Sequence, residues 1–199
     1  MTLHRDLSRG LGIAVFALLL TGCVGRVAAP EPAALAQPVE VFLLDHGRHA
    51  SLVLPGESSG VVRYSYGEWR WYVEGERHFL AGVSAMLWPT EAGLGRGVHP
   101  EIDHPREFSR LAPEGLVAVY PLHAEAARVG ALRSRLDAHF EDSRGEPVAS
   151  DEFGLEFVPY PRRYSALHQS NLIVAHWLRD LDVEISGSPW LSNWRIDAP

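Results

Sequence analysis

The sequence contains very little cysteine: Cys23 is the only one among 199 residues. The chain after Cys23 therefore has neither a disulfide nor a free thiol. This excludes a disulfide-stabilised scaffold for the body of the protein. It also excludes an enzyme that attacks its substrate with a cysteine thiolate.

The chain also has a deficit of positive charge. It carries 18 Lys and Arg residues against 25 Asp and Glu residues, which gives a formal net charge of −7. An acidic protein gains no affinity from displacing the counterions of phosphates, so we expect no nucleic acid as a partner. The same deficit argues against a polybasic segment that binds anionic lipid headgroups.

The N-terminal apolar run is too short to cross a membrane. Residues 11–20 (LGIAVFALLL) follow the basic residues Arg5 and Arg9. A transmembrane helix needs about 20 apolar residues. A shorter apolar core after a basic start is typical of a signal peptide. We therefore expect residues 1–22 to be a signal peptide that is removed from the mature protein.

The signal peptide ends in Leu20-Thr21-Gly22-Cys23, which matches the lipobox of bacterial lipoproteins. We predict cleavage before Cys23 and attachment of diacylglycerol and a fatty acid such as palmitate to this residue. Several acyl chains on one residue would anchor the protein firmly to a membrane, on the periplasmic side of the cell envelope. Val24, rather than an aspartate, follows Cys23, and this favours the outer membrane. An ordinary signal peptide with a chance cysteine is the alternative.

The remaining chain divides into a tether and one domain. Residues 23–38 are rich in Ala and Pro and predict a lipidated N-terminus followed by a flexible tether. Residues 39–199 are long enough for a single globular domain. Apolar patterns predict strands at residues 39–44, 49–54, 61–72, 116–122 and 155–158, helices at 79–87, 124–140 and 171–181, and irregular structure over 89–115. The expected class is α+β, an antiparallel sheet packed against helices.

Three motifs carry a resemblance to a known family. They are His46-Gly47-Arg48-His49-Ala50 with Val53-Leu54-Pro55 after it, Tyr64-Ser65-Tyr66-Gly67-Glu68 with Trp71-Tyr72 after it, and Ser170-Asn171-Leu172-Ile173 at the start of the last predicted helix. In order, spacing and largely in residue type they resemble the bacterial family called domain of unknown function 2459. The resemblance spans residues 39–195.

That family is distantly similar to circularly permuted papain-like thiol hydrolases of the NlpC type. The resemblance implies a permuted papain-like architecture, in which a histidine on an early strand meets a cysteine at the start of a late helix. The helix N-terminus stabilises a thiolate, the histidine takes the proton, and a third polar group orients the histidine. Carried over to this sequence, His49 is the base, Ser170 stands at the nucleophile position, and Glu68 is the candidate orienting residue.

The serine at position 170 leaves several functions open. A hydroxyl is a much weaker acid than a thiol, and a helix dipole worth about 1 kcal/mol does not ionise it. We therefore expect a non-catalytic envelope lipoprotein that binds a cell-wall or lipid ligand in the former active-site cleft. The first alternative is a hydrolase or acyltransferase that acts on an amide or ester through Ser170 and His49, as in a serine triad. The second is an interaction module that does not use the cleft.

Simpler roles are also open for these residues. Ser170, before an apolar helix, fits an N-cap, and Glu68 fits an ion-paired strand residue. His46 and His49 with Asp45 suggest a metal site, as does the run from His99 to His104 (HPEIDH). Neither group has a familiar ligand spacing. We therefore expect no metal and no other cofactor.

Overall fold

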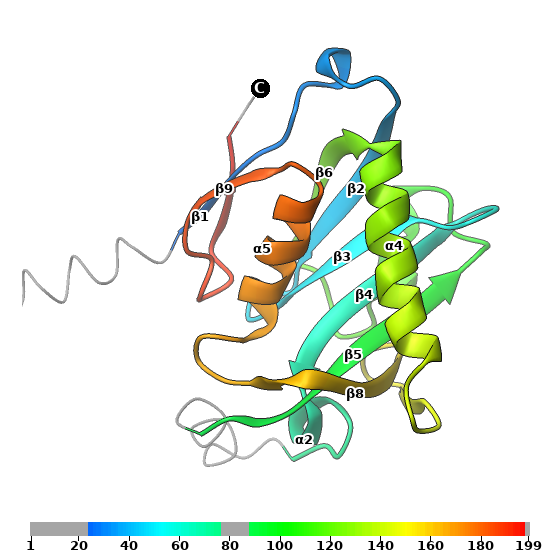
Figure 1. Cartoon of the computed structure of the whole chain (residues 1–199), viewed down its shortest axis with the longest axis vertical. Helices are drawn as coiled ribbons and strands as arrows, with labels where there is room; N and C mark the ends of the chain where they lie inside the picture. The colour runs from blue at the N-terminus through cyan, green and yellow to red at the C-terminus, as the bar shows by residue number, and fades with distance from the viewer. Residues whose placement is uncertain (1–23, 77–87, 198–199) are drawn as a thin grey trace, which may run out of the picture.

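The computed structural model describes residues 24–76 and 88–197, and its main feature is an antiparallel sheet of seven strands (Figure 1). The strands lie in the order β6-β2-β3-β4-β5-β8-β7. Their bounds are Pro38–Asp45 (β2), Ala50–Pro55 (β3), Val61–Glu68 (β4), Thr90–His99 (β5), Ala118–Glu125 (β6), Val148–Ser150 (β7) and Leu155–Tyr164 (β8). Helices pack on this sheet, so the predicted α+β class is confirmed.

Two amphipathic helices, α4 (Ala126–Glu141) and α5 (Ser170–Asp180), cover one face of the sheet (Figure 1). The apolar positions predicted from the sequence are buried in both: Val129, Leu132, Leu136 and Phe140 of α4, and Val174, Trp177, Leu178 and Leu181 at α5. They pack against sheet residues such as Leu43, Leu52 and Tyr64 in the largest core cluster. Burial of this apolar surface, at about 25 cal/mol per Å², is the main term that favours the folded state.

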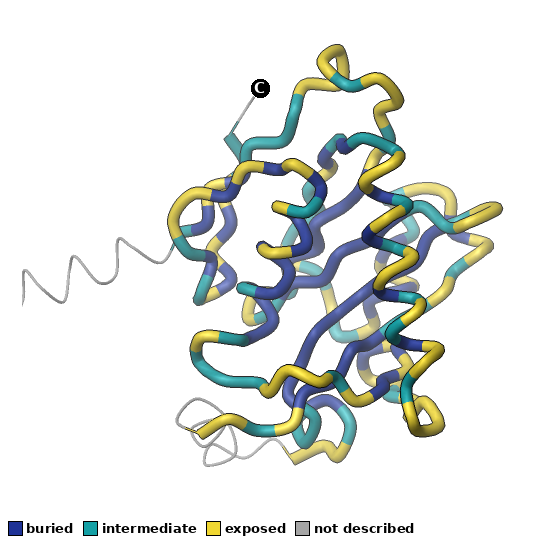
Figure 2. Tube along the Cα trace, viewed as in Figure 1, coloured by how far each residue is buried: buried dark blue, intermediate teal, exposed yellow. Residues whose placement is uncertain are grey.

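The other face of the sheet is covered by the 3₁₀ helix η2 (Pro105–Arg110) and the loop that follows it. Phe42, Leu44 and Val53 pack there against Phe108 and Leu111. Side chains alternate between the two faces along a strand, so neighbours in sequence enter different layers. In Figure 2 the central strands are dark blue because they are buried beneath the helices.

A second sheet of three strands brings the start and the end of the described chain together (Figure 1). β1 (Gly25–Ala28) pairs antiparallel with β9 (Glu184–Gly187) and parallel with β10 (Trp194–Ile196). Val27 is completely buried. The prediction of a tether over residues 23–38 is therefore wrong for β1. Strand pairing uses main-chain groups that almost any residue supplies, so one buried valine gave no readable pattern.

Residues 31–37, by contrast, are largely exposed around the short 3₁₀ helix η1 (Pro32–Ala34), as predicted for a segment outside the core.

The structure also corrects two predicted elements. Residues 89–115 are not irregular throughout, because β5 lies in the middle of the sheet. The glycines of β5 obscure the strand pattern in the sequence. A Cβ on Gly95 would lie 2.7 Å from a ring atom of Phe157, so the glycine makes room for this aromatic ring. The strand predicted to reach Tyr72 ends at Glu68 and continues as the short helix α2 (Trp69–Tyr72). The helix predicted at residues 79–87 lies outside the described residues.

Candidate functional site

Ser170 is the first residue of α5, and its side chain is enclosed. Its exposed fraction is 3%, and its hydroxyl donates to the side-chain oxygen of Gln169 at 3.3 Å. Gln169, not Ser170, caps the helix, because its side-chain oxygen accepts from the backbone N–H of Asn171 at 2.7 Å. The N-cap role expected for Ser170 therefore belongs to the residue before it, and Ser170 only supports that cap.

A tyrosine, and not a histidine, faces the Ser170 side chain. Burial, together with the charge of Glu68, raises the pKa of Tyr164 to about 12, although hydrogen bonding with Ser170 opposes this rise. Tyr164 stacks on Tyr66, with ring centroids 5.9 Å apart, on the face of the sheet that α5 covers. At neutral pH the phenol is protonated, so it cannot act as the base that a serine nucleophile needs.

Glu68 does not orient His49. It is buried at the end of β4, where its carboxylate caps α2 by accepting from the backbone N–H of Trp71 at 2.8 Å. It also pairs with the Arg70 side chain at 3.0 Å. The structural role that we kept open for Glu68 is the one observed.

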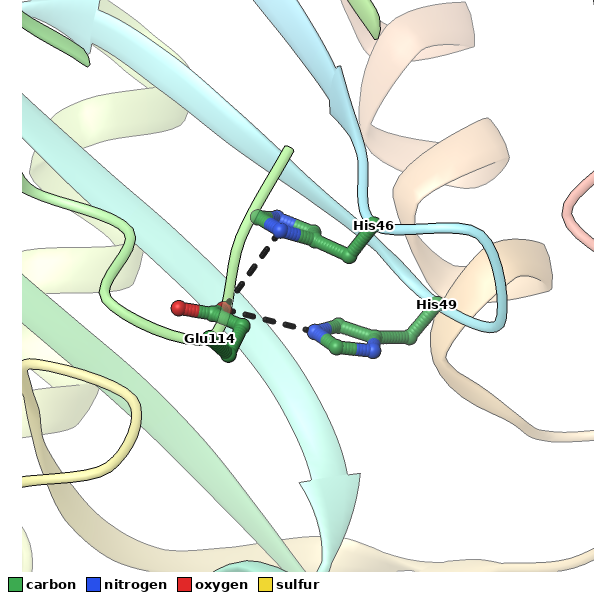
Figure 3. A group of neighbouring side chains, drawn as sticks. All are labelled: His46, His49 and Glu114. Carbon is green, nitrogen blue, oxygen red and sulfur yellow. Dashed lines mark hydrogen bonds and ion pairs between the residues drawn. The ribbon is translucent and has the colours of Figure 1, made fainter. Parts of the chain in front are cut away.

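His49 points to the other face of the sheet. Its Nε2 lies 3.4 Å from a carboxylate oxygen of Glu114, and its ring stacks on that of His46 with centroids 4.5 Å apart (Figure 3). The rings of Tyr72 and Phe153 contact its other sides. In β3, Leu52 and Leu54 pack beneath the helices, whereas Val53 packs on the opposite face. His49 lies an even number of positions before Val53, so its side chain points to the same face of the sheet as Val53.

The predicted pair of His49 and Ser170 is therefore not formed. The two segments are neighbours, since the Asn171 side chain donates to the carbonyl of Arg48 at 3.2 Å. Among the described residues, however, no hydrogen bond joins the imidazole to the hydroxyl. The reason is the alternation of side chains along a strand, in which neighbouring residues point to opposite faces of the sheet. The sequence motif alone does not fix which residues of β3 face the helices.

A buried group of charged and polar side chains surrounds Arg63 on this second face. We call it the Arg63 cluster; it consists of His46, His49, Ser51, Arg63 and Glu114. Arg63 is completely buried in the middle of β4 and forms an ion pair with Glu114. Its guanidinium also donates to the carbonyls of Leu111 at 2.7 Å and Phe153 at 3.0 Å. The cluster thus ties the loop before β6 and the loop before β8 to the sheet.

The hydrogen bonds of the Arg63 cluster fix the state of His46. Arg63 Nε donates to the Ser51 hydroxyl at 2.9 Å, and that oxygen lies 2.8 Å from His46 Nε2. His46 Nδ1 lies 2.7 Å from the carbonyl of Gly115, so it carries the proton and Nε2 accepts. Burial, together with the positive charge of Arg63, lowers the pKa of His46 to about 3. His46 is therefore neutral at physiological pH.

Glu114 remains ionised in this setting. Burial alone would raise the pKa of its carboxyl, but the hydrogen bond with His49 and the positive charge of Arg63 outweigh burial and lower the pKa to about 2. A buried carboxylate with a guanidinium partner is a stable arrangement only while both partners are present.

The donor atoms of His46, His49 and Glu114 all lie within 4.8 Å of one another, a spacing that raises the question of a metal ion. Three features oppose it. His46 Nδ1 uses its proton on Gly115, the imidazole planes are nearly parallel at 12° so their lone pairs do not converge, and Arg63 already supplies the positive charge. The cluster is better described as a guanidinium–carboxylate network than as a metal centre.

The other histidines considered as ligands have structural partners. His104 caps η2 by accepting from the backbone N–H of Arg106 at 3.1 Å, and His99 lies 3.9 Å from Glu101. Asp45 accepts from the hydroxyl of Ser192 and the backbone N–H of Gly47, both at 2.8 Å. It does not join His46 and His49 as a third ligand.

Sequence reasoning missed Arg63 and Glu114. One signal for Arg63 was present, because an arginine inside the apolar run Val61 to Tyr66 needs a buried partner. No local signal marks Glu114, which lies between a proline and a glycine in an irregular loop. Cys23, the predicted lipidation site, lies outside the described residues. In the part of the chain that the structure describes, no helix is long and apolar enough to cross a membrane.

The fold and the cluster define an α+β domain with a buried ionic network around Arg63. No protein-family model, no curated protein and no solved structure matches this chain.

Proposed function

We propose that this chain is a lipoprotein of the bacterial cell envelope whose domain binds a ligand and does not catalyse a reaction at Ser170. We also propose that it belongs to the family called domain of unknown function 2459, on the three motifs described above. The anchor is the acylated Cys23, on the periplasmic side and in the outer membrane. The ligand is a cell-wall or lipid component, because these are the molecules within reach of an anchored domain.

One observation carries the non-catalytic part of this proposal. The Ser170 hydroxyl is buried against Gln169 and Tyr164, while the imidazole that should activate it is on the opposite face of the sheet and faces Glu114. A serine nucleophile needs a base within hydrogen-bond reach to accept its proton during attack. In this arrangement His49 cannot do so.

A permuted papain-like architecture is our proposal for the finer fold. It is supported by the position of α5, which packs on β3 and β4 and begins beside the turn that carries His49. It is also supported by the order of the motifs, with the histidine before the residue at the nucleophile position. On this proposal the chain keeps the papain-like arrangement of strands and helix. It lacks the catalytic contact between nucleophile and base because position 170 is a serine and because His49 points to the opposite face.

The test is labelling of the full-length protein with a serine-reactive fluorophosphonate. We expect no labelling of the wild type, and none of Ser170→Ala, His49→Ala or the control Ser109→Ala, which replaces an exposed serine. Labelling that disappears in both Ser170→Ala and His49→Ala but persists in Ser109→Ala would replace our proposal by the serine-dependent hydrolase or acyltransferase.

Two further measurements test the remaining parts. Metabolic labelling with palmitate should mark the wild type and not Cys23→Ala, and equal labelling of both would remove the anchor. Detergent-solubilised protein should sediment with purified cell-wall sacculi, or soluble short-chain phospholipid should slow hydrogen–deuterium exchange in the domain. Binding of neither would remove the proposed ligand class.

A further inference from the structure

The first described residue, Val24, directly follows the predicted lipidation site and is already hydrogen-bonded to the domain. The carbonyl of Val24 accepts from the backbone N–H of Ser188 at 3.1 Å, and the N–H of Gly25 donates to the carbonyl of Asn193 at 2.9 Å. Gly25 also lies so close to Pro189 that a Cβ would be 2.6 Å from its side chain. Cys23 is the next residue, and adjacent Cα atoms are about 3.8 Å apart. An acyl group on Cys23 would therefore start beside the loop of residues 188–193.

That loop and a second one form a single edge of the molecule. The Trp190 side chain in loop 188–193 donates to the carbonyl of Ala166 at 2.6 Å, and Gln169 donates to the carbonyl of Trp190 at 2.8 Å. Ser165 and His168 pair through their main chains, so Ala166 and Leu167 form the tip of a tight turn. We call the loops of residues 165–169 and 188–193 the anchor edge; both lie on the side where β1 starts (Figure 1).

The anchor edge exposes large apolar side chains. Leu167 is 82% exposed and Leu191 is 52% exposed, one on each loop. Apart from His168, the two loops contain no ionisable side chain; the exposed Arg162 and Arg163 precede the first loop in the sequence, and the exposed Arg195 follows the second. Exposed leucines on loops without carboxylates suit insertion at the boundary between acyl chains and headgroups.

We propose that the anchor edge lies directly on the lipid bilayer in which Cys23 is held, with Leu167 and Leu191 inserted into the interface. The inference rests on the proposed lipidation of Cys23, and it adds what the anchor alone does not give, a fixed orientation of the domain. A flexible tether would let the domain rotate freely above the membrane. With Val24 already paired in the small sheet, no length of chain is left for such rotation.

The experiment places a fluorescent probe at the anchor edge of the lipidated, full-length protein. Because Cys23 is acylated, a cysteine introduced by Leu167→Cys or Leu191→Cys is the one thiol left for labelling with an environment-sensitive nitrobenzoxadiazole dye. Val98→Cys is the matched control, since Val98 is 58% exposed and lies where β5 pairs with the start of β4, away from the anchor edge. Each protein is reconstituted in vesicles of phosphatidylethanolamine and phosphatidylglycerol.

We expect blue-shifted emission and a several-fold lower iodide quenching constant at positions 167 and 191, and unprotected emission at position 98. Equal quenching at all three positions, with intact mass showing that Cys23 is acylated, would overturn the docking while leaving the anchor in place. An intact mass without acyl chains would overturn the anchor and the docking together. Protection that disappears when excess lipid dilutes the protein would show contact between copies of the chain and would also overturn the docking.

Discussion

Arg63 of β4 and Glu114 of the loop before β6 form an ion pair in which the arginine side chain has no exposed surface. The pair joins two segments that are 51 residues apart in the sequence. Burial removes the hydration of both charges, so each depends on the other for its stability.

Loss of either Arg63 or Glu114 should therefore strongly reduce the stability of the fold. Arg63→Met leaves the Glu114 carboxylate buried and unpaired, and we expect the free energy of unfolding to fall by about 3–5 kcal/mol. Urea denaturation followed by circular dichroism measures this change. As a control, Arg135→Met removes the ion pair of Arg135 with Asp180, in which the arginine side chain is 57% exposed, and should cost less than about 1 kcal/mol.

A double variant should reveal the coupling between the two charges. In Arg63→Met/Glu114→Leu the unpaired carboxylate is gone, so the total loss of stability should be smaller than the sum of the two single losses. Additive losses would show that Arg63 and Glu114 do not depend on each other.

Acidification should destabilise the protein from about pH 6.5 downward. The pKa of His46 is lowered by folding from 6.5 to about 3, so its contribution is complete above pH 6.5 and is lost as the pH falls towards 3. The pKa of Glu114 is lowered from 4.5 to about 2, and its contribution is lost between these values. Both effects have the same sign. The free energy of unfolding, measured with urea at several pH values, should fall as the pH falls.

The variant His46→Asn separates the histidine from the carboxylate. Its amide replaces the donor to Gly115 but does not titrate, so the pH dependence between pH 6.5 and 4.5 should become shallower. Part of the slope should remain, because the pKa values of His99 and His168 are also lowered, mainly by burial. An unchanged slope in the variant would contradict the role given to His46.

Two glycines with different surroundings should respond in opposite ways to alanine. A Cβ on Gly67 would lie 2.3 Å from a ring atom of Tyr72, so Gly67→Ala should cost about 1–3 kcal/mol through overpacking. Gly130 lies inside α4, and apart from its own helix backbone and chain neighbours no atom lies within 4 Å of its Cβ position, so Gly130→Ala should add about 0.5–1 kcal/mol of stability. Thermal melts of both variants provide the measurement. A gain of stability in Gly67→Ala would refute the packing described for Gly67, and a loss in Gly130→Ala would refute the open space described for Gly130.

The first strand should be protected from solvent exchange. β1 is hydrogen-bonded on both sides, whereas residues 31–37 are largely exposed. In hydrogen–deuterium exchange with mass spectrometry, peptides that cover residues 25–28 should exchange much more slowly than those that cover 31–37. Equally fast exchange in the two segments would restore the tether that the composition suggests.

The candidate site shows where prediction from the sequence stops. The hairpin that carries His49 and the helix that begins at Ser170 were predicted close to their observed positions. The direction of the His49 side chain was not, because it depends on which residues of β3 face the helices. The partner of His49 was missed for a different reason: Glu114 comes from an irregular loop, and only the folding of that loop over β4 brings it to Arg63.

The sequence by itself determined the properties that follow from local chemistry. The apolar stripes of α4 and α5 and the strand at β2 could be predicted because helix and strand periodicities are short-range. The prediction of a signal peptide rests on neighbouring residues, and the absence of thiols after Cys23 follows from counting. Only the tertiary structure decided that Gly25–Ala28 forms a strand, that His49 and Ser170 point to opposite faces, and that Arg63 meets Glu114. These three features depend on contacts between segments that are distant in the sequence. Such contacts form only when the chain folds, so they produce no periodic pattern in the sequence.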